Sequence, residues 1–567
     1  MKKLFQYLKK YTKECILGPL FKLFEASFEL IVPLVVARMI DVDIAASDKG
    51  GAARDGVILI ALGIFGLLFS VTAQYFSAKA AVGVASDMRH SLFARIQSLS
   101  YSDIDETGTA SLITRMTSDI NTLQNGINMA LRLFLRSPFI VFGAAAMAFA
   151  VDTRLALIFA VVIPVLAVIV YGIMLLTMPL FKKVQKKLEG VVGITGDTLS
   201  GARVIRAFCS EDEEYERFKA ENDELAKLQK RAGRLSALTN PLTYVVINAA
   251  LIVLIRNGAI RVDAGLISVG GVIALYNYMS QILVELIKLA NLIVTVTKAL
   301  TCAGRISSVL DMPAETAGEG CGKNFPGKVC FEDVSMKYRA SGGDSLEDVS
   351  FTVETGQTVG IIGGTGSGKS TLVNMIPRFY EASGGTVAVD GQDVKLWDAS
   401  ELRRRIAVVF QKSVLFRGSV RDNLLWGNEG ASDEELKDAL KKAQAYDFIF
   451  EKSGLDTPVD GGGRNFSGGQ RQRLCVARAL VRRPDILILD DAGSALDFAT
   501  DAAMRHEIAN LDYRPTVFIV TQRASSVMNA DKVIVLDDGK VAGIGTHEEL
   551  LASCPVYKEI YDSQYAS

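Results

Sequence analysis

A glycine-rich stretch in the second half of the chain carries the clearest chemistry in the sequence. It fits the pattern GxxxxGK[ST], follows the strand-like run TVGIIG and leads into the helix-like run STLVNMIPRF. Glycines in such a loop let backbone N–H groups turn toward a phosphate, while the lysine reaches the terminal phosphates and the serine hydroxyl ligates Mg²⁺. The residues expected to contact a nucleotide here are Gly363, Gly364, Thr365, Gly366, Ser367, Gly368, Lys369, Ser370 and Thr371.

A second chemical group lies at the end of a hydrophobic run further along the chain. The run ILILD ends at Asp490, 121 residues after Lys369. An acidic residue at the end of a buried strand beside a phosphate loop is the expected second contact to Mg²⁺. Alone this pattern is a weak signal, but together with the glycine-rich loop it predicts a site for a nucleotide and Mg²⁺.

A third stretch, FSGGQ followed by RQR, resembles the signature motif of ATP-binding cassette (ABC) proteins. Three further positions resemble that family: Tyr338 the aromatic that stacks on adenine, Gln411 the Q-loop residue, and Asp497 the last residue of the D-loop. The resemblance implies ATP and Mg²⁺ as cofactors, with Gln411 joining Ser370 and Asp490 around the metal. It also implies that two cassettes sandwich two ATP molecules, each held by the phosphate loop of one cassette and the signature motif of the other. The residues that would reach the other cassette's ATP are Ser467, Gly468, Gly469, Gln470 and Asp497.

Two positions depart from the family pattern, and both serve hydrolysis rather than binding. The family has glutamate directly after the strand-end aspartate, where this chain has Asp491. Aspartate is one methylene shorter, which sets its carboxylate roughly 1–1.5 Å back, and an error of that size lowers a rate about 10²-fold. The family has histidine after the next strand, where this chain has Gln522, a side chain that cannot carry a charge or relay a proton.

Because its signature motif is intact while its own hydrolytic positions are altered, the chain is expected to bind ATP and cleave it poorly. A homodimer would contain two impaired sites. The sequence therefore predicts a second, non-identical ABC half-transporter as partner, with intact glutamate and histidine. A slower but working enzyme remains the simpler alternative.

The elements around these motifs indicate a multidomain chain with two kinds of fold. After a Gly- and Pro-bearing linker at 311–326, short β-type runs alternate with helical patterns over 327–567. That alternation is typical of an α/β P-loop NTPase with a largely parallel sheet. By the resemblance, it is an ABC cassette with a helical subdomain.

The first 310 residues are expected to form an all-α transmembrane domain of six spans. Four charge-free stretches of 21 to 27 residues are long enough to cross a bilayer, and two more stretches are interrupted by charge. The expected spans are 16–40, 56–78, 129–151, 155–181, 235–255 and 264–296. The segments 79–128 and 182–234 are expected to be helical cytosolic loops that pass closure of the cassettes to the spans.

The lysine-rich N-terminus indicates that this end is cytosolic. The whole pattern resembles a half-transporter of the bacterial ABC exporter type, which places the chain across the bacterial plasma (inner) membrane with its cassette in the cytosol. Nucleic acid is not expected as a partner, because 62 basic residues face 63 acidic ones. The seven cysteines contain no CxxC pair and are expected to be reduced thiols rather than a metal or redox site.

Charges within the expected spans bear on what is transported. Lys22, Glu25 and Glu29 share one face of the first span, and Glu285 lies in the last. These charges either form a cation-attracting face of the translocation path or pair with one another inside the bundle. Arg132 and Arg136 are expected at a helix end, reaching toward headgroups.

Aromatic, methionine and sparse charged residues in the spans fit a small amphipathic, multidrug-like substrate. The predicted function is ATP-driven export of such molecules by a heterodimer. Two alternatives stay open: an ATP-gated or regulatory membrane protein, and a homodimeric lipid or peptide exporter with slow turnover.

Overall fold

The computed structural model describes residues 2–315, 322–338 and 343–565, so residues 316–321 of the predicted linker 311–326 lie outside the described residues. The chain divides into two compact units. The first contains Met1–Arg95 and Ala110–Met312, and the second contains Ile96–Thr109 and Pro313–Ser567. A short piece of the membrane half, Ile96–Thr109, therefore belongs with the second unit.

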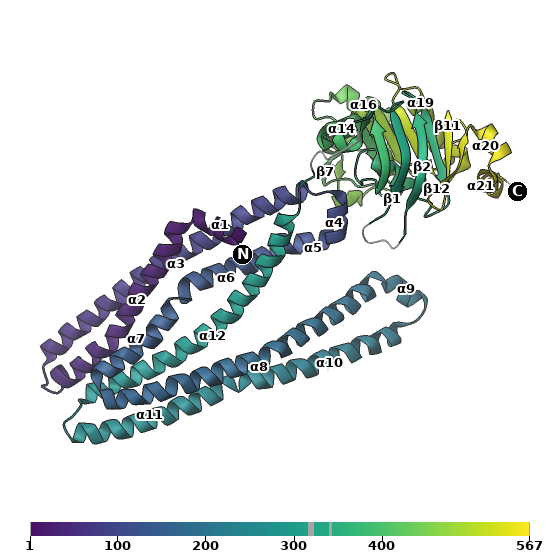
Figure 1. The fold of residues 1–567 in the computed structure, drawn as a ribbon. Coiled ribbons are helices and arrows are strands. Elements are labelled where there is room, and N and C mark those ends of the chain that lie inside the picture. The colour runs from purple at the N-terminus through teal and green to yellow at the C-terminus, as the bar shows by residue number, and fades with distance from the viewer. Residues whose placement is uncertain (1, 316–321, 339–342, 566–567) are drawn as a thin grey trace. The chain divides into compact units, whose positions relative to one another are not determined.

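The first unit is helical throughout its described residues, and α8 and α10 run side by side along most of their length (Figure 1). Its helices are α1 (Lys2–Lys10), α2 (Thr12–Arg38), η1 (Met39–Ile44), α3 (Lys49–Gln97), α5 (Thr109–Thr114), η2 (Arg115–Asp119), α6 (Ile120–Leu133), α7 (Arg136–Val151), α8 (Thr153–Ser200), α9 (Ala202–Ala207), α10 (Glu211–Ala237), α11 (Thr239–Asp263) and α12 (Val269–Asp311).

Three of these helices are far longer than a bilayer requires. Helices α3, α8 and α12 contain 49, 48 and 43 residues, and a hydrocarbon core of about 30 Å needs only about 20. Their inner ends therefore continue beyond the membrane as unbroken helices. The expectation that segments 79–128 and 182–234 are helical is confirmed.

Five helical segments in the described part of the chain are long and apolar enough to cross a membrane. The first expected span, 16–40, is not among these five; it falls mainly in α2, which has 27 residues but carries Lys22, Glu25 and Glu29. These charges lower its apolar character below that of the other five. A count of six spans therefore remains a prediction.

The third expected span, 129–151, is not one continuous helix. Helix α6 ends at Leu133 and α7 begins at Arg136, with a turn at Phe134 and Leu135 between them. Pro138 explains the break: it has no N–H to donate to the carbonyl of Phe134, and its ring clashes with that carbonyl in a regular helix.

The second unit contains two main β-sheets. The larger has the strand order β12-β11-β3-β10-β9-β6, in which β11, β3, β10, β9 and β6 are parallel and only the edge strand β12 is antiparallel. Its strands are β3 (Thr358–Gly363), β6 (Ile406–Val409), β9 (Ile486–Asp490), β10 (Thr516–Thr521), β11 (Lys532–Asp537) and β12 (Lys540–Gly545).

The smaller sheet is antiparallel, with the order β2-β1-β4-β5. Its strands are β1 (Val329–Met336), β2 (Leu346–Val353), β4 (Gly384–Val389) and β5 (Gln392–Asp393). The β-type runs at 329–336 and 385–391 fall largely in β1 and β4, so they belong to this antiparallel sheet rather than to the parallel one. Strand β1 pairs with β2 on one side and β4 on the other, and its register is irregular against each.

Helices cover the parallel sheet and form a helical subdomain beside it. They are α13 (Lys369–Met375), α14 (Ala399–Arg405), α15 (Val420–Leu425), α16 (Asp433–Lys442), α17 (Tyr446–Phe450), α18 (Gly468–Val481), α19 (Phe498–Ala509), α20 (His547–Ser553) and α21 (Pro555–Tyr565). Residues of α15, α16 and α18 share one hydrophobic core with β9, whose five residues are all buried. The short helix α4 (Tyr101–Thr107) also belongs to this unit.

Candidate functional site

The predicted site residues follow four neighbouring strands of the parallel sheet. The loop with Lys369 follows β3, Asp490 ends β9, Gln522 follows β10, and Gln411 comes two residues after β6. Because the carboxyl ends of parallel strands meet at one edge of a sheet, these segments converge although up to 153 residues of sequence separate them.

A cavity of about 220 Å³ lies at this edge. It brings together most of the predicted binding, metal and catalytic positions, and it adds Ser345, Val520 and Thr521, which the sequence did not single out. The predicted residues that line it are Thr365, Gly366, Gly368, Lys369, Ser370, Thr371, Gln411, Asp490, Asp491 and Gln522. Gly363, Gly364 and Ser367 lie in the same loop and contact the lysine amine rather than the cavity itself.

The glycine-rich loop has the backbone shape that its glycines predict. Gly368 has φ 94°, and a Cβ atom there would lie 2.6 Å from the carbonyl oxygen of Ser345. No residue other than glycine fits that position without moving the backbone. Helix α13 starts at the next residue, Lys369, so the loop leads directly into a helix as expected.

The lysine amine lies inside the curve of the loop. Lys369 Nζ donates to the carbonyl oxygens of Gly363 at 2.9 Å and Gly364 at 2.5 Å. Burial lowers the pKa of this ammonium group, while the carboxylates of Asp490 and Asp491 act in the opposite direction. A phosphate that enters the loop would replace these carbonyl contacts with charge-assisted ones.

The expected metal ligands are already in contact with each other. Ser370 Oγ donates to Asp490 Oδ1 at 2.9 Å, and burial raises the pKa of the Asp490 carboxyl, against the effect of the serine hydrogen bond. A hydroxyl, one carboxylate and the amide of Gln411 are oxygen donors that suit Mg²⁺, which takes one or two carboxylates and completes its shell with phosphate oxygens and water. The residues present fit Mg²⁺ bound together with a nucleotide.

Asp491 is held rigidly through its backbone. Its N–H donates to Val520 O at 2.9 Å, and its carbonyl accepts hydrogen bonds from Gln472 Nε2 at 2.8 Å and Ser494 Oγ at 2.9 Å. It has φ 53°, a left-handed conformation that aspartate tolerates better than most residues. The reach of its carboxylate is therefore decided by the side chain alone.

The two altered positions face the same cavity as the lysine. Asp491 Oδ2 accepts a hydrogen bond from Gln411 Nε2 at 3.4 Å, and Gln522 lines the cavity with an uncharged amide. No histidine lines the cavity, and all three histidines lie within the described chain. His506 contacts Asn510 on α19, His547 contacts Tyr557, and His90 is on α3.

Tyr338 lies beside the loop rather than in the cavity lining. Its hydroxyl is 3.0 Å from Thr371 Oγ1, and its ring makes an edge contact with Tyr380 at 5.1 Å between centroids. The structure thus places this aromatic next to the residue that follows Ser370.

The signature motif and Asp497 lie elsewhere in the cassette. Ser467 caps α18: its Oγ accepts from the Gln470 N–H, and the Gln470 side chain accepts from the Ser467 N–H. Asp497 caps α19 in the same way through the Thr500 N–H. Among the described residues that line the cavity, none is Ser467, Gly468, Gly469, Gln470 or Asp497.

Gln472 is a functional candidate that sequence reasoning missed. Besides its bond to the carbonyl of Asp491, its Oε1 accepts from the Ala495 N–H at 3.3 Å. It therefore joins α18, which follows the signature motif, to the segment between Asp490 and Asp497. Its position in the quoted run SGGQRQR was the available signal, but the sequence did not show which glutamine is buried.

Aromatic contacts connect α4 to this site. The ring of Tyr101 on α4 lies 4.3 Å from that of Phe379, which stacks on Phe410 at 5.8 Å, next to Gln411. Tyr380 donates to Asp105 Oδ2 at 2.5 Å. Burial and this bond raise the pKa of the Tyr380 hydroxyl. Segment 79–128, which is expected to pass on cassette closure, thus contacts the cassette through the Tyr101 ring. The contact continues through Phe379 to Phe410, whose neighbour in sequence, Gln411, lines the cavity.

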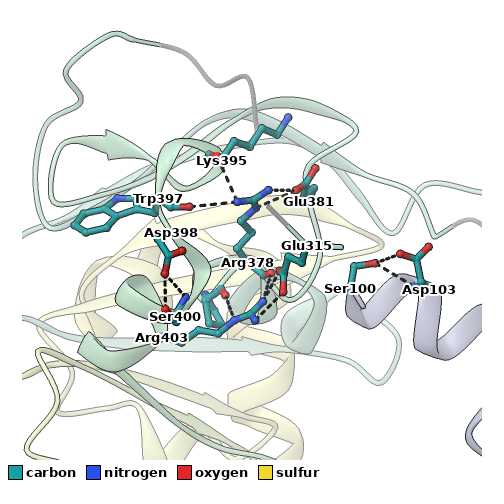
Figure 2. A network of polar contacts seen from close by, with 11 residues as sticks. Ser100, Asp103, Glu315, Arg378, Glu381, Lys395, Trp397, Asp398, Ser400 and Arg403 are labelled. Atoms are coloured by element: carbon teal, nitrogen blue, oxygen red, sulfur yellow. Dashed lines mark hydrogen bonds and ion pairs between the residues drawn. The ribbon is translucent and has the colours of Figure 1, made fainter. Parts of the chain in front are cut away.

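Arg403 on α14 contacts several neighbouring segments of the second unit (Figure 2). Its guanidinium forms two hydrogen bonds with the Glu315 carboxylate, at 2.9 and 2.6 Å, and donates to the carbonyl oxygens of Pro377 and Arg378. It also lies over the rings of Tyr101 and Phe379. Glu315, which follows the membrane half, is thereby fixed to the same surface as α4.

The charges within the first unit pair with one another. Arg136 donates to Glu285 at 2.7 Å and to Glu29 at 2.6 Å, Lys22 contacts Glu25, and Lys288 contacts Glu285. Internal pairing, the second of the two expectations, is what the structure shows. The expectation that Arg136 reaches toward headgroups is wrong: its side chain is 7% exposed, because two carboxylates from other helices hold it inside the bundle.

Comparisons with known proteins agree with this architecture. Residues 15–286 match the family of the ABC transporter transmembrane region, and residues 346–494 match the ABC transporter family.

An ABC transporter ATP-binding protein of Mycobacterium tuberculosis is 36% identical over 99% of this chain and 98% of its own length. YfiB of Bacillus subtilis is 35% identical over 100% and 99%. An ATP-dependent lipid A-core flippase of Desulfotalea psychrophila is 32% identical over 85% and 84%.

The fold is also similar to that of a bacterial Atm1-family ABC exporter solved with ATP bound, with a TM-score of 0.82, 23% identity and 99% of each chain covered. Sequence, site geometry and relatives agree on one family. The chain belongs to the ABC transporters: it is an exporter-type half-transporter ATPase, a multi-pass inner-membrane protein whose cytosolic cassette binds ATP and Mg²⁺.

Proposed function

We propose that this chain is one half of a heterodimeric exporter of amphipathic small molecules, and that its own nucleotide site holds ATP but cleaves it slowly. The observation that carries the proposal is the lining of one cavity by an intact binding set and two altered hydrolytic positions, Asp491 and Gln522.

The binding half of the site supports retention of ATP. Lys369 is buried among loop carbonyls that a phosphate can replace, and Ser370 and Asp490 are in hydrogen-bond contact at 2.9 Å. Neither feature depends on the two altered residues. ATP and Mg²⁺ are therefore expected to bind with ordinary affinity.

The hydrolytic half supports slow cleavage. The backbone of Asp491 is fixed by hydrogen bonds to Val520, Gln472 and Ser494. The shorter side chain therefore cannot be compensated by a shift of the chain, and a general base must lie within hydrogen-bond reach of the attacking water. Gln522 cannot supply positive charge to the transferred phosphate.

The position of the signature motif supports a role at a second cassette. Ser467 is exposed and begins α18, and none of Ser467, Gly468 and Gly469 is among the described residues that line the chain's own cavity. A phosphate from another cassette would find small residues and free backbone donors there. An intact signature motif in a chain whose own nucleotide site is impaired favours a non-identical partner.

The substrate class is supported by the membrane half and by one relative. Apolar side chains and sparse charge line its cavities, and such surfaces suit amphipathic molecules. A relative at 32% identity is named a lipid A-core flippase, and lipid A-core is itself amphipathic.

ATP binding and turnover by the full chain alone, purified in lipid nanodiscs, test the proposal. We expect saturable ATP binding with turnover at least about 10²-fold below that of the chain combined with its partner half-transporter. Rapid hydrolysis by the single chain would overturn the proposal.

Transport separates an exporter from an ATP-gated or regulatory protein. Inside-out vesicles that contain both halves should accumulate an amphipathic substrate only when ATP and both chains are present. ATP-dependent flux that equilibrates without accumulation would favour the channel-like alternative.

A further inference from the structure

The first unit contains a cavity of about 630 Å³ between α8, the α10–α11 junction and α12. Its volume is in the range of pockets that hold drug-sized ligands. Most of its lining is apolar, but two lysines, Lys182 on α8 and Lys298 on α12, face it together. Both lysines occur on helices that the sequence predicted to reach the inner side of the membrane.

The two lysines lie at the same depth. Helix α12 runs inward, because it leads to the cytosolic cassette. The chain crosses the membrane once between α8 and α12, in α11, so α8 runs in the same direction as α12. Lys182 is 29 residues from the start of α8, and Lys298 is 29 residues from the start of α12. At 1.5 Å per residue this is about 43 Å, which corresponds to the inner headgroup region.

The opposite end of the cavity is apolar and lies deeper in the membrane. Val170 and Ile173 on α8, and Ile287 on α12, line it. They are 17, 20 and 18 residues from the starts of their helices, or about 26–30 Å, which is inside the inner leaflet's hydrocarbon. The cavity is thus apolar at the depth of the lipid alkyl chains and cationic at the depth of the lipid headgroups.

The lysines have no carboxylate to neutralise them. In the part of the chain that the structure describes, neither Lys182 nor Lys298 forms an ion pair, and no acidic residue is among those lining the cavity. The acidic residues of the neighbouring spans are already paired: Glu285 with Arg136 and Lys288, and Glu29 with Arg136. The cavity therefore presents two unmatched positive charges.

We propose that this cavity binds an amphipathic anion of the inner leaflet, with its acidic headgroup between Lys182 and Lys298 and its alkyl chain against Val170, Ile173 and Ile287. The inference rests on the proposed export of amphipathic molecules and names the charge of the substrate. The sequence left a cation-attracting face open beside internal pairing of the charges, and the observed pairing of the spans' carboxylates leaves the two lysines as the charges that face this cavity.

Binding of two single-chain lipids tests the assignment. Lysophosphatidylglycerol and lysophosphatidylcholine with the same acyl chain differ in headgroup charge and share the apolar part. Equilibrium binding of each radiolabelled lipid is measured on the full chain in phosphatidylcholine nanodiscs without nucleotide, after subtraction of binding to empty nanodiscs.

We expect tighter binding of the anionic lipid, and a loss of about 10- to 30-fold in its affinity in the double variant Lys182→Gln, Lys298→Gln, because each lysine near a membrane surface contributes about one factor of five. The zwitterionic lipid should bind both proteins alike. Lys183→Gln with Lys186→Gln is the matched control, since it removes the same charge from neighbouring residues of α8 that do not line the cavity.

Equal binding of the two lipids to the unaltered chain would overturn the assignment. So would an equal loss of affinity in the control variant, which would show general surface attraction. Since no nucleotide is present, slow or rapid ATP cleavage does not affect these results, and failure here would leave the heterodimer proposal standing.

Discussion

Lengthening the carboxylate at position 491 should restore hydrolysis at this chain's own site. In the structure, three hydrogen bonds fix the backbone of Asp491, so Asp491→Glu moves the carboxylate forward by one methylene without shifting the chain. Recovery of general-base reach corresponds to about 10²-fold in rate, or about 2.7 kcal/mol of activation free energy. Gln522→His adds a group that can carry charge to the lining of the same cavity.

The substitution is not free of a structural effect. Asp491 has φ 53°, and glutamate is less suited than aspartate to the left-handed region. Asp491→Glu is therefore expected to lower the free energy of unfolding of the cassette by about 1 kcal/mol. A small fall in melting temperature together with a rise in turnover would show that both effects come from one position.

Single-turnover hydrolysis of [γ-³²P]ATP, with the full chain in excess over nucleotide, is the suitable assay. Two copies of this chain supply two intact signature motifs, so a homodimer contains everything that the altered site needs from a second cassette. We expect about a 10²-fold rise for Asp491→Glu with Gln522→His. Asp491→Asn serves as the control, because it keeps the length of the side chain and removes its charge.

The control decides between two explanations of slow turnover. If Asp491 does not reach the attacking water, Asp491→Asn should change the rate by less than about threefold. A loss of more than tenfold in Asp491→Asn, or no gain in Asp491→Glu with Gln522→His, would refute the argument from side-chain reach.

Three further predictions follow from other parts of the cassette. Ser467→Ala should leave ATP binding by this chain unchanged and lower the turnover of the complex with its partner about tenfold, because a hydrogen bond to a charged phosphate is lost; nucleotide binding and ATPase assays on the same complex check both. Arg403→Gln should lower the melting temperature of the full chain by roughly 4–8 °C, since it removes about 2 kcal/mol of charged hydrogen bonds to Glu315; Arg404→Gln, an exposed neighbour, should have little effect in calorimetry. Tyr380→Phe and Asp105→Asn should show a coupling energy of about 1 kcal/mol in a double-mutant cycle of unfolding, and additive effects would contradict the 2.5 Å contact.

The nucleotide site could be predicted from the sequence because its residues follow local patterns. Each motif occupies one short run of sequence: the loop at 363–370, the strand end at Asp490 and the signature motif. The parallel strands that precede the loop and end at Asp490 have their carboxyl ends at one edge of the sheet. Asp491 and Gln522 were found for the same reason, as departures within such runs.

Contacts between distant segments were not predictable in this way. Arg136 meets Glu285 across 149 residues and Glu29 across 107, and neither spacing has a helical or strand period. Its burial overturned the expected orientation of that arginine and decided between the two expectations for the charges of the membrane half. The grouping of α4 with the cassette likewise depends on rings of Tyr101, Phe379 and Phe410 whose pairing no local pattern indicates.

Photolabelling shows whether ATP bound at this chain's own loop is cleaved. Tyr338 and Thr371 lie together beside the loop, so an 8-azido-ATP bound there is expected to label this chain. The complex with the partner half-transporter is allowed to turn over either [α-³²P]- or [γ-³²P]8-azido-ATP, is cross-linked, and the two subunits are separated. We expect nearly equal α and γ label on this chain, which means uncleaved ATP, and α label alone on the partner. Loss of the γ label from this chain at the same rate as from the partner would show that this chain's site is not impaired in hydrolysis.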